Sequence, residues 1–121
     1  MAAPISGTAV FTQEATGVTL GIALSNCQDG KSYPIHIHVG VSCTDSNAPG
    51  GHWDSPRGDT IPNVMCKGTS ASTNYTRLNS DPNKPWSIGG AMDSDIVGHT
   101  MVLHDPDDQT QRIACGKIVA Q

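Results

Sequence analysis

Short segments in which apolar and polar residues alternate recur along this chain, and Gly, Pro, Asn and Asp separate them. Successive side chains of a β-strand point to opposite faces of a sheet, so a period of two predicts strands with one buried face. No segment shows the longer period of an amphipathic helix. The pattern therefore predicts an all-β fold, a sandwich or barrel of short antiparallel strands. The expected strands are residues 5–12, 18–25, 33–41, 61–67, 72–78, 98–104 and 111–119.

The composition agrees with short strands and many loops. Only 4% of the residues are aromatic and 36% are hydrophobic, with 13 Gly and 8 Pro. A length of 121 residues suits a single domain, residues 1–121. Residues 42–60 lack apolar periodicity and predict a long ordered loop, which in a compact domain is usually functional. In the first expected strand Ile5, Ala9 and Phe11 should share one face, and in the second Leu20, Ile22 and Leu24 should face inward.

The charge pattern excludes several kinds of partner. The net charge is −4 and the 7 Lys and Arg residues form no cluster, which argues against nucleic acid as a partner. No segment reaches the ~20 apolar residues of a membrane span. The start, Met1-Ala2-Ala3-Pro4, lacks the charged and apolar regions of a signal peptide, so export would imply a leader already removed.

The chain contains four cysteines, and their number and spacing bear on the cellular compartment. They contain no C-x-x-C pair, so neither a zinc finger nor a thioredoxin motif is indicated. Two disulfides are expected, and with them an extracellular or periplasmic location, because disulfides persist in oxidising compartments. Four buried thiols in a cytosolic protein are the alternative. The cysteines are Cys27, Cys43, Cys66 and Cys115.

A His-x-His pair marks the expected strand 33–41. His36 and His38 should share one face of this strand, while Ile35, Ile37 and Val39 take the other. Imidazole-rich sites suit copper or zinc, and two more histidines, His52 and His104, are available on separate segments. The alternative is a polar stripe on a half-exposed strand, because short motifs often arise by chance.

Read in chain order, these residues resemble the copper/zinc superoxide dismutase family over roughly residues 5–121. The resemblance implies a Greek-key β-barrel or sandwich, Ig-like in architecture, with seven or eight antiparallel strands and a long metal-site loop. The family's first strand has no clear counterpart before Ile5. The segments that carry the resemblance are His36-x-His38, Cys43, Gly51-His52-Trp53, Gly58-Asp59, Gly98-His99-Thr100-Met101-Val102-Leu103-His104 and Arg112-Ile113-Ala114-Cys115-Gly116.

The resemblance implies a role for each matched residue. The copper ligands would be His36, His38, His52 and His104, and Arg112 would steer superoxide onto copper. Cys43 and Cys115 would form the family's disulfide, which leaves Cys27 and Cys66 to pair with each other. His52 would also carry protons, leaving copper as the metal is reduced.

Two departures from the family pattern point to its copper-only branch. Of the zinc ligands only His52 and Asp59 can be matched, and His99, at opposite parity to His104, should face the other side of the sheet. Two ligands cannot close a tetrahedral zinc site, so no zinc is expected. The family's electrostatic loop is reduced to residues 105–111. Where that branch commonly has a glutamate, this chain has Pro56.

The expected activity is therefore that of a copper-only superoxide dismutase, with superoxide as its partner and its oligomeric state left open. Without zinc, Asp59 is the expected partner of the second nitrogen of His52; the alternative is a simple turn residue. Arg112 as an ordinary surface arginine is also possible. A noncatalytic copper-binding or assembly module on the same fold remains open, as does an Ig-like adhesion domain with an incidental histidine cluster.

Overall fold

The computed structural model describes residues 5–40, 42–43, 49–91, 93–108 and 111–118, and these contain eight strands and no helix. The all-β prediction is confirmed. No helix among the described residues has the length and hydropathy to cross a membrane. The strands are β1 (Ser6–Gln13), β2 (Gly17–Ser25), β3 (Ser32–Tyr33), β4 (Ile35–His38), β5 (Val64–Met65), β6 (Ser70–Leu78), β7 (Thr100–His104) and β8 (Arg112–Lys117).

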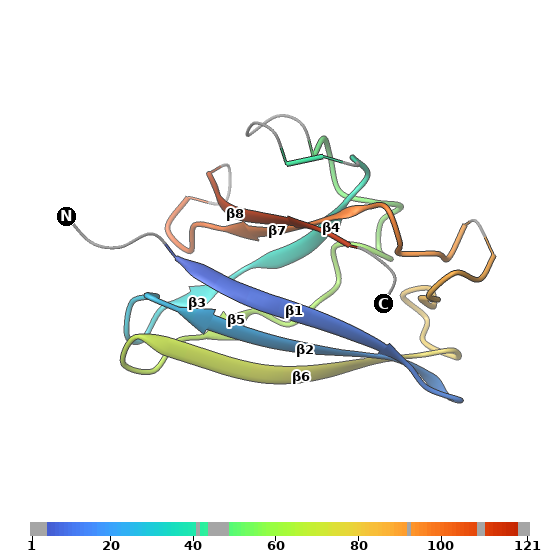
Figure 1. Cartoon of the computed structure of the whole chain (residues 1–121), viewed down its shortest axis with the longest axis horizontal. Coiled ribbons are helices and arrows are strands. Elements are labelled where there is room, and N and C mark those ends of the chain that lie inside the picture. The colour runs from blue at the N-terminus through green and yellow to red at the C-terminus, as the bar shows by residue number, and fades with distance from the viewer. Residues whose placement is uncertain (1–4, 41, 44–48, 92, 109–110, 119–121) are drawn as a thin grey trace.

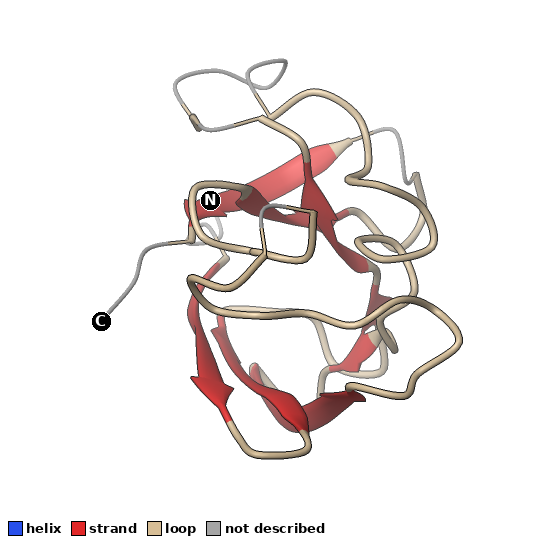
Figure 2. Cartoon of the chain, turned by 90° about the vertical axis from the view of Figure 1, so that its right-hand side faces the viewer, coloured by secondary structure: helices blue, strands red, loops and turns tan. Residues whose placement is uncertain are grey.

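The larger sheets form two layers, as Figures 1 and 2 show. One layer has the order β1-β2-β6, the other has the order β4-β7-β8, and every pairing is antiparallel. A two-stranded sheet, β3-β5, completes the set. The described strands form a sandwich-like arrangement and do not close into a barrel.

The core lies between the two layers and follows the predicted alternation most closely in β2. Leu20, Ile22 and Leu24 are buried there, as expected, while the residues between them are more exposed. The three residues expected to share one face of the first strand are less buried than those of β2. Ala9 is exposed, and Ile5 and Phe11 are only half-buried, because β1 borders its sheet and no described strand covers its second edge.

The expected strand 33–41 is interrupted at Pro34, which separates β3 from β4. Proline has no N–H to donate to a ladder, so an unbroken central strand is unfavourable there. Its carbonyl accepts a hydrogen bond from the N–H of His104 at 2.8 Å. Because β4 ends at His38, Val39 lies beyond the strand and is exposed, unlike Ile35 and Ile37. Position 41 lies outside the described residues.

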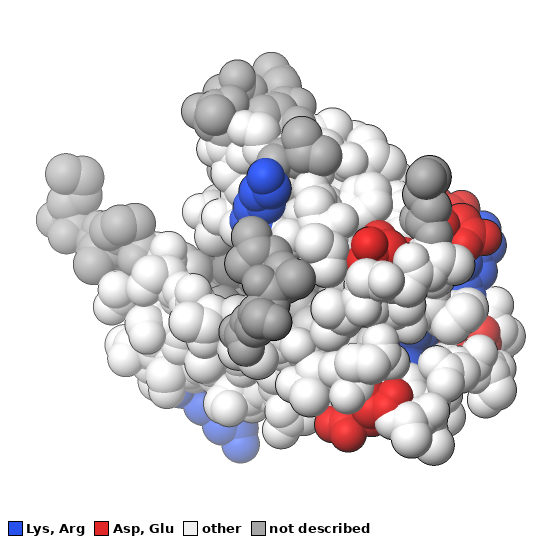
Figure 3. Space-filling model, turned by 45° about the vertical axis from the view of Figure 1, so that its right-hand side comes forward, with Lys and Arg blue, Asp and Glu red and all other residues white. Residues whose placement is uncertain are grey.

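The two predicted loops that flank the histidines are present. The described parts of residues 42–60 contain no strand, and residues 105–108 and 111 form a short connection between β7 and β8. There the Asp107 N–H donates to Asp105 Oδ1, and the Asp105 N–H donates to the Gln111 carbonyl. Charged side chains are sparse and scattered over the face drawn in Figure 3.

Candidate metal centre

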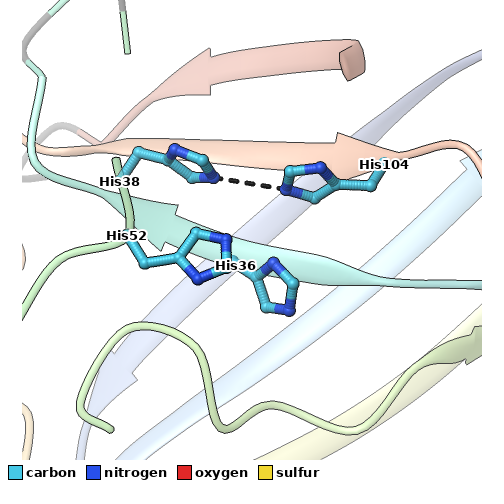
Figure 4. Close-up of side chains that lie close together, drawn as sticks. All are labelled: His36, His38, His52 and His104. Carbon is cyan, nitrogen blue, oxygen red and sulfur yellow. Dashed lines mark hydrogen bonds between the residues drawn. The ribbon is translucent and has the colours of Figure 1, made fainter. Parts of the chain in front are cut away.

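Four histidines from three separate segments converge at one place (Figure 4). His36 and His38 come from β4, His104 from the end of β7, and His52 from the long loop. One ring nitrogen of each can be chosen so that all four nitrogens lie within 4.8 Å of one another. These are the four residues that the resemblance to copper/zinc superoxide dismutases implies as copper ligands.

The pairing of β4 with β7 brings three of these rings together. Ile35 and Ile37 are buried in the core, so the alternation of β4 turns His36 and His38 to its other face. Ile35 lies opposite Leu103, which places His104 just beyond the start of β4. Three of the four candidate ligands are thus positioned by the pairing of two strands rather than by loop conformation.

The fourth ring is positioned because the long loop returns along β4. The Val39 N–H donates to the Gly51 carbonyl, and the Trp53 N–H donates to the Ile37 carbonyl, each at 2.9 Å. His52 sits between these two bonds and forms an isolated bridge with His38. Its side chain is 37% exposed, whereas His38 and His104 are buried. His52 is therefore the candidate ligand most accessible to solvent.

Hydrogen bonding fixes the state of the His38 ring. Its Nδ1 lies 2.8 Å from the Gly50 carbonyl, which can only accept, so Nδ1 carries the proton and Nε2 has a free lone pair. Nε2 lies 3.2 Å from His104 Nε2 (Figure 4). Two imidazole nitrogens that share an ion at about 2.0–2.1 Å lie no more than ~4 Å apart. The 3.2 Å between these two nitrogens therefore fits one shared ion. The largest nitrogen–nitrogen distance among the four histidines, within 4.8 Å, is only slightly greater than ~4 Å.

Burial keeps two of the rings neutral. Burial and, to a smaller extent, the neighbouring rings of His52, His104 and His38 together lower the pKa of His36 to about 4, because adjacent positive charges repel. Burial likewise lowers the pKa of His38 to about 4. His36 Nδ1 is buried and has no hydrogen-bond partner among the described residues. A buried polar atom without a partner is costly, and a metal ion would satisfy it.

Arg112 is the first residue of β8 and lies directly opposite His104. Its Nη2 donates to the Gly50 carbonyl at 2.6 Å, the same oxygen that accepts from His38. Gly50 thus connects a candidate ligand to the guanidinium, a role that sequence reasoning missed. The available signal was the pair Gly50-Gly51 before His52: Gly50 has φ +70°, and an added Cβ would lie 3.1 Å from Val39 Cγ2.

Asp59 lies beside His52, as expected. Its Oδ2 is 3.5 Å from His52 Nδ1 and accepts a hydrogen bond from Ser55 Oγ at 2.7 Å. Burial alone would raise the pKa of Asp59, but the hydrogen bonds from Ser55 and His52 outweigh it and lower the pKa. The carboxylate is therefore ionised and faces the second nitrogen of His52.

Both expected disulfides are present. Cys43 bridges to Cys115 with a Cα–Cα distance of 5.9 Å, and Cys27 bridges to Cys66 with 6.1 Å. The first is exposed and ties the long loop to β8, three residues beyond Arg112. The second is buried in the core. Chain entropy in a loop of this size contributes on the order of 4 kcal/mol for the first bridge.

His99 lies outside the cluster, as its parity predicted. Its ring stacks on Trp53 with 4.4 Å between centroids, and its Nδ1 contacts the Val39 carbonyl at 3.1 Å. Among the described residues the four histidines are the only group of three or more His, Cys, Asp or Glu residues that could hold a metal ion.

A buried arginine that sequence reasoning missed, Arg77, holds the end of the long loop by hydrogen bonds. Arg77 of β6 is fully buried and stacks on Trp86 with 4.5 Å from Cζ to the ring centroid. The available signal was an arginine at an inward position of a predicted strand. Its guanidinium donates to Tyr75 Oη and to the carbonyls of Arg57, Thr60, Asn83 and Lys84, at 2.7–3.2 Å.

Comparison with models of known protein families and with curated proteins gave no match. The functional conclusion therefore rests on the geometry of the four-histidine cluster and the groups around it.

Proposed function

We propose that this chain is a copper-only superoxide dismutase, on the Greek-key, Ig-like topology of the copper/zinc superoxide dismutases. The observation that carries the proposal is the convergence of four imidazoles that includes an unsatisfied buried nitrogen. Neutral imidazole is the preferred donor for copper and zinc among protein side chains. His36, His38, His52 and His104 would hold the ion.

Redox chemistry distinguishes the two metals. When bound, copper supplies one-electron chemistry, because it alternates between Cu(II) and Cu(I), which zinc does not. One superoxide would lose an electron to give oxygen, and a second would gain one electron and two protons to give hydrogen peroxide. Zinc is not part of the proposal, because His52 and Asp59 are the only matched zinc ligands.

His52 is suited to deliver a proton. Its ring is the most exposed of the four, so it can exchange protons with water. Asp59 faces its Nδ1 at 3.5 Å and would fix the orientation of the ring. The Ser55 hydroxyl in turn holds the Asp59 carboxylate in place.

Arg112 is suited to attract the anionic substrate. The protein carries a net charge of −4, and Asp105, Asp107 and Asp108 follow directly after His104. A guanidinium held by the Gly50 carbonyl gives a fixed positive charge and hydrogen-bond donors beside the cluster. Lys31 reduces the opposing negative charge by pairing with Asp107 at 2.8 Å.

The two disulfides are compatible with an oxidising location, and we place the proposed activity outside the cytosol, in the extracellular space or the periplasm.

Metal analysis combined with a superoxide assay tests the proposal. The metal-free chain is incubated with copper and zinc together, freed of excess metal, and analysed for both elements. We expect about one copper per chain and no stoichiometric zinc, and rapid superoxide consumption after pulsed generation. The matched control is His36→Ala treated identically. Copper uptake without consumption above that control would overturn the enzyme proposal and favour the noncatalytic copper-binding module. A full equivalent of zinc would refute the copper-only proposal.

A further inference from the structure

The sandwich is open along one edge, between β1 and β8 (Figure 1). Among the described strands β1 pairs only with β2 and β8 only with β7, so each leaves one edge without a partner strand. Two cavities of about 590 and 390 Å³ lie there, and both are lined by β1 and β8. Core residues such as Ile22, Leu24 and Leu103 line the smaller one. The apolar interior is therefore accessible at this edge.

β1 lacks the features that usually protect an exposed edge strand. Edge strands are commonly short or carry charged residues or proline, which prevent pairing with other chains. β1 has eight residues, none of them charged and none proline, and none of its side chains is fully buried. Val10, near its centre, is 45% exposed.

The charges of the other border strands indicate which strand would pair with its own copy. In antiparallel self-pairing of β8, Arg112 of one copy would approach Lys117 of the other, and like charges in opposed positions are destabilising. Self-pairing of β1 brings no charges together. β6, at the far edge of the β1-β2-β6 sheet, lies against β5. β4, at the far edge of the other sheet, is covered by the long loop, where the Ile37 N–H donates to the Gly58 carbonyl at 2.8 Å. Among the border strands of the two larger sheets, β1 is thus the one that carries no charge and lines the opening.

We propose that two copies of this chain associate through antiparallel pairing of β1 with β1. The two β1-β2-β6 sheets would then join into one continuous sheet, with each β1 covering the opening beside the other. The symmetry is twofold, so the interface uses the same surface on both copies and closes after two. The edge N–H and C=O groups of β1 would gain partners, as in other cases of strand addition. The four-histidine cluster is not part of this surface.

Sedimentation over a wide range of micromolar concentrations tests the association. We expect the mass to rise to twice that of one chain. The decisive variant is Val10→Lys, which places two ammonium groups near the twofold axis and should raise the dimer dissociation constant about tenfold or more. The matched control is Leu78→Lys on β6, because Leu78 is 46% exposed and borders the same sheet on its other side. This control should dimerise like the unsubstituted chain.

Hydrogen exchange on the unsubstituted chain provides a test that needs no variant. Amides of β1 should exchange more slowly at high than at low protein concentration, and amides of β6 should not change. A chain that stays monomeric throughout, or equal weakening by Val10→Lys and Leu78→Lys, would overturn the proposal. Unchanged copper uptake by Val10→Lys would show that this variant is folded.

Discussion

Two polar clusters of this molecule, one centred on Arg77 and the other made of the four histidines, differ in how their hydrogen bonds are satisfied. Each guanidinium nitrogen of Arg77 donates to a protein oxygen at 2.7–3.2 Å. In the four-histidine cluster His36 Nδ1 has no partner among the described residues, and the Nε2 atoms of His38 and His104 face each other at 3.2 Å. The first cluster is satisfied within the protein, whereas the second contains a buried nitrogen that an added ion could satisfy.

This difference separates a structural role from a binding role. A fully bonded buried network stabilises one arrangement of the chain, and removing its centre leaves several groups unsatisfied. In the four-histidine cluster the buried His36 Nδ1 already lowers the stability of the metal-free protein, because it has no hydrogen-bond partner among the described residues. Removing that histidine therefore also removes this unfavourable contribution. The two clusters should therefore respond in opposite ways to substitution.

The largest effect is expected for Arg77→Met. Methionine fills much of the volume of arginine but cannot donate a hydrogen bond. The carbonyls that lose their donor are those of Arg57, Thr60, Asn83 and Lys84. Each carbonyl that water cannot reach lowers the free energy of unfolding by ~1–3 kcal/mol. We expect the free energy of unfolding to fall by at least about 3 kcal/mol, measured by urea denaturation of the metal-free protein. Lys117→Met, at an exposed site, should change it by less than ~0.5 kcal/mol. A loss below ~1 kcal/mol for Arg77→Met would contradict the structural role.

His36→Ala should show the opposite pattern. It removes a ligand, so copper affinity in a competition titration should fall by about 100-fold or more, because even residues that only support ligands account for 10–100-fold. The metal-free protein should lose less than ~1 kcal/mol, since the substitution also removes the unsatisfied Nδ1. His99→Ala is the control, with unchanged copper affinity. A strongly destabilised metal-free His36→Ala protein would show that the cluster is structural.

A smaller effect is expected for Arg112→Ala. The rate constant for superoxide consumption should fall by about tenfold, within the range of electrostatic steering, while copper affinity changes little. Arg112→Lys should keep part of the rate because it keeps the charge. The rate of the unsubstituted protein should also decline as ionic strength rises, which pulsed superoxide generation at several salt concentrations can measure. Equal rates for Arg112→Ala and the unsubstituted protein would refute steering.

The stability of the metal-free protein should also depend on pH. The pKa values of His36 and His38 are about 4 when folded and 6.5 when unfolded, so the unfolded chain binds more protons between these values. Stability from these groups is therefore complete above about pH 6.5 and is lost as pH falls toward 4. Urea denaturation across this range measures the slope. His36→Ala should flatten it, and an unchanged slope in that variant would contradict the assignment.

Sequence periodicity predicted the parts of the fold that depend on a local pattern. The alternation in β2 and β4 placed Leu20 and Ile37 in the core, and the opposite parities of His99 and His104 separated these two rings. Such predictions succeed because strand geometry alone sets the side-chain direction. The convergence of His36 with His104 was expected only through the family resemblance.

Other features depend on contacts that no local pattern encodes. The pattern places Ala9 on one face with Ile5 and Phe11, but the exposure of Ala9 depends on whether another strand lies beside β1. The Gly50 carbonyl acts through backbone, which has no sequence signature beyond the glycine itself. Arg77 follows the alternation of its strand, yet its burial depends on carbonyls contributed by residues 57–60 and 83–84.

The bonds from Arg77 to residues 57 and 60 also bear on local opening of the long loop. Loops usually exchange their amide hydrogens through small fluctuations that leave the rest of the protein folded. Here the carbonyls of Arg57 and Thr60 are held by a side chain of β6, and Arg57 also accepts from Trp86 Nε1 at 2.8 Å. Freeing this segment would disrupt the core around Trp86. Residues 57–60 should therefore open only with the β1-β2-β6 sheet, as part of the same cooperative unit, although they form no strand.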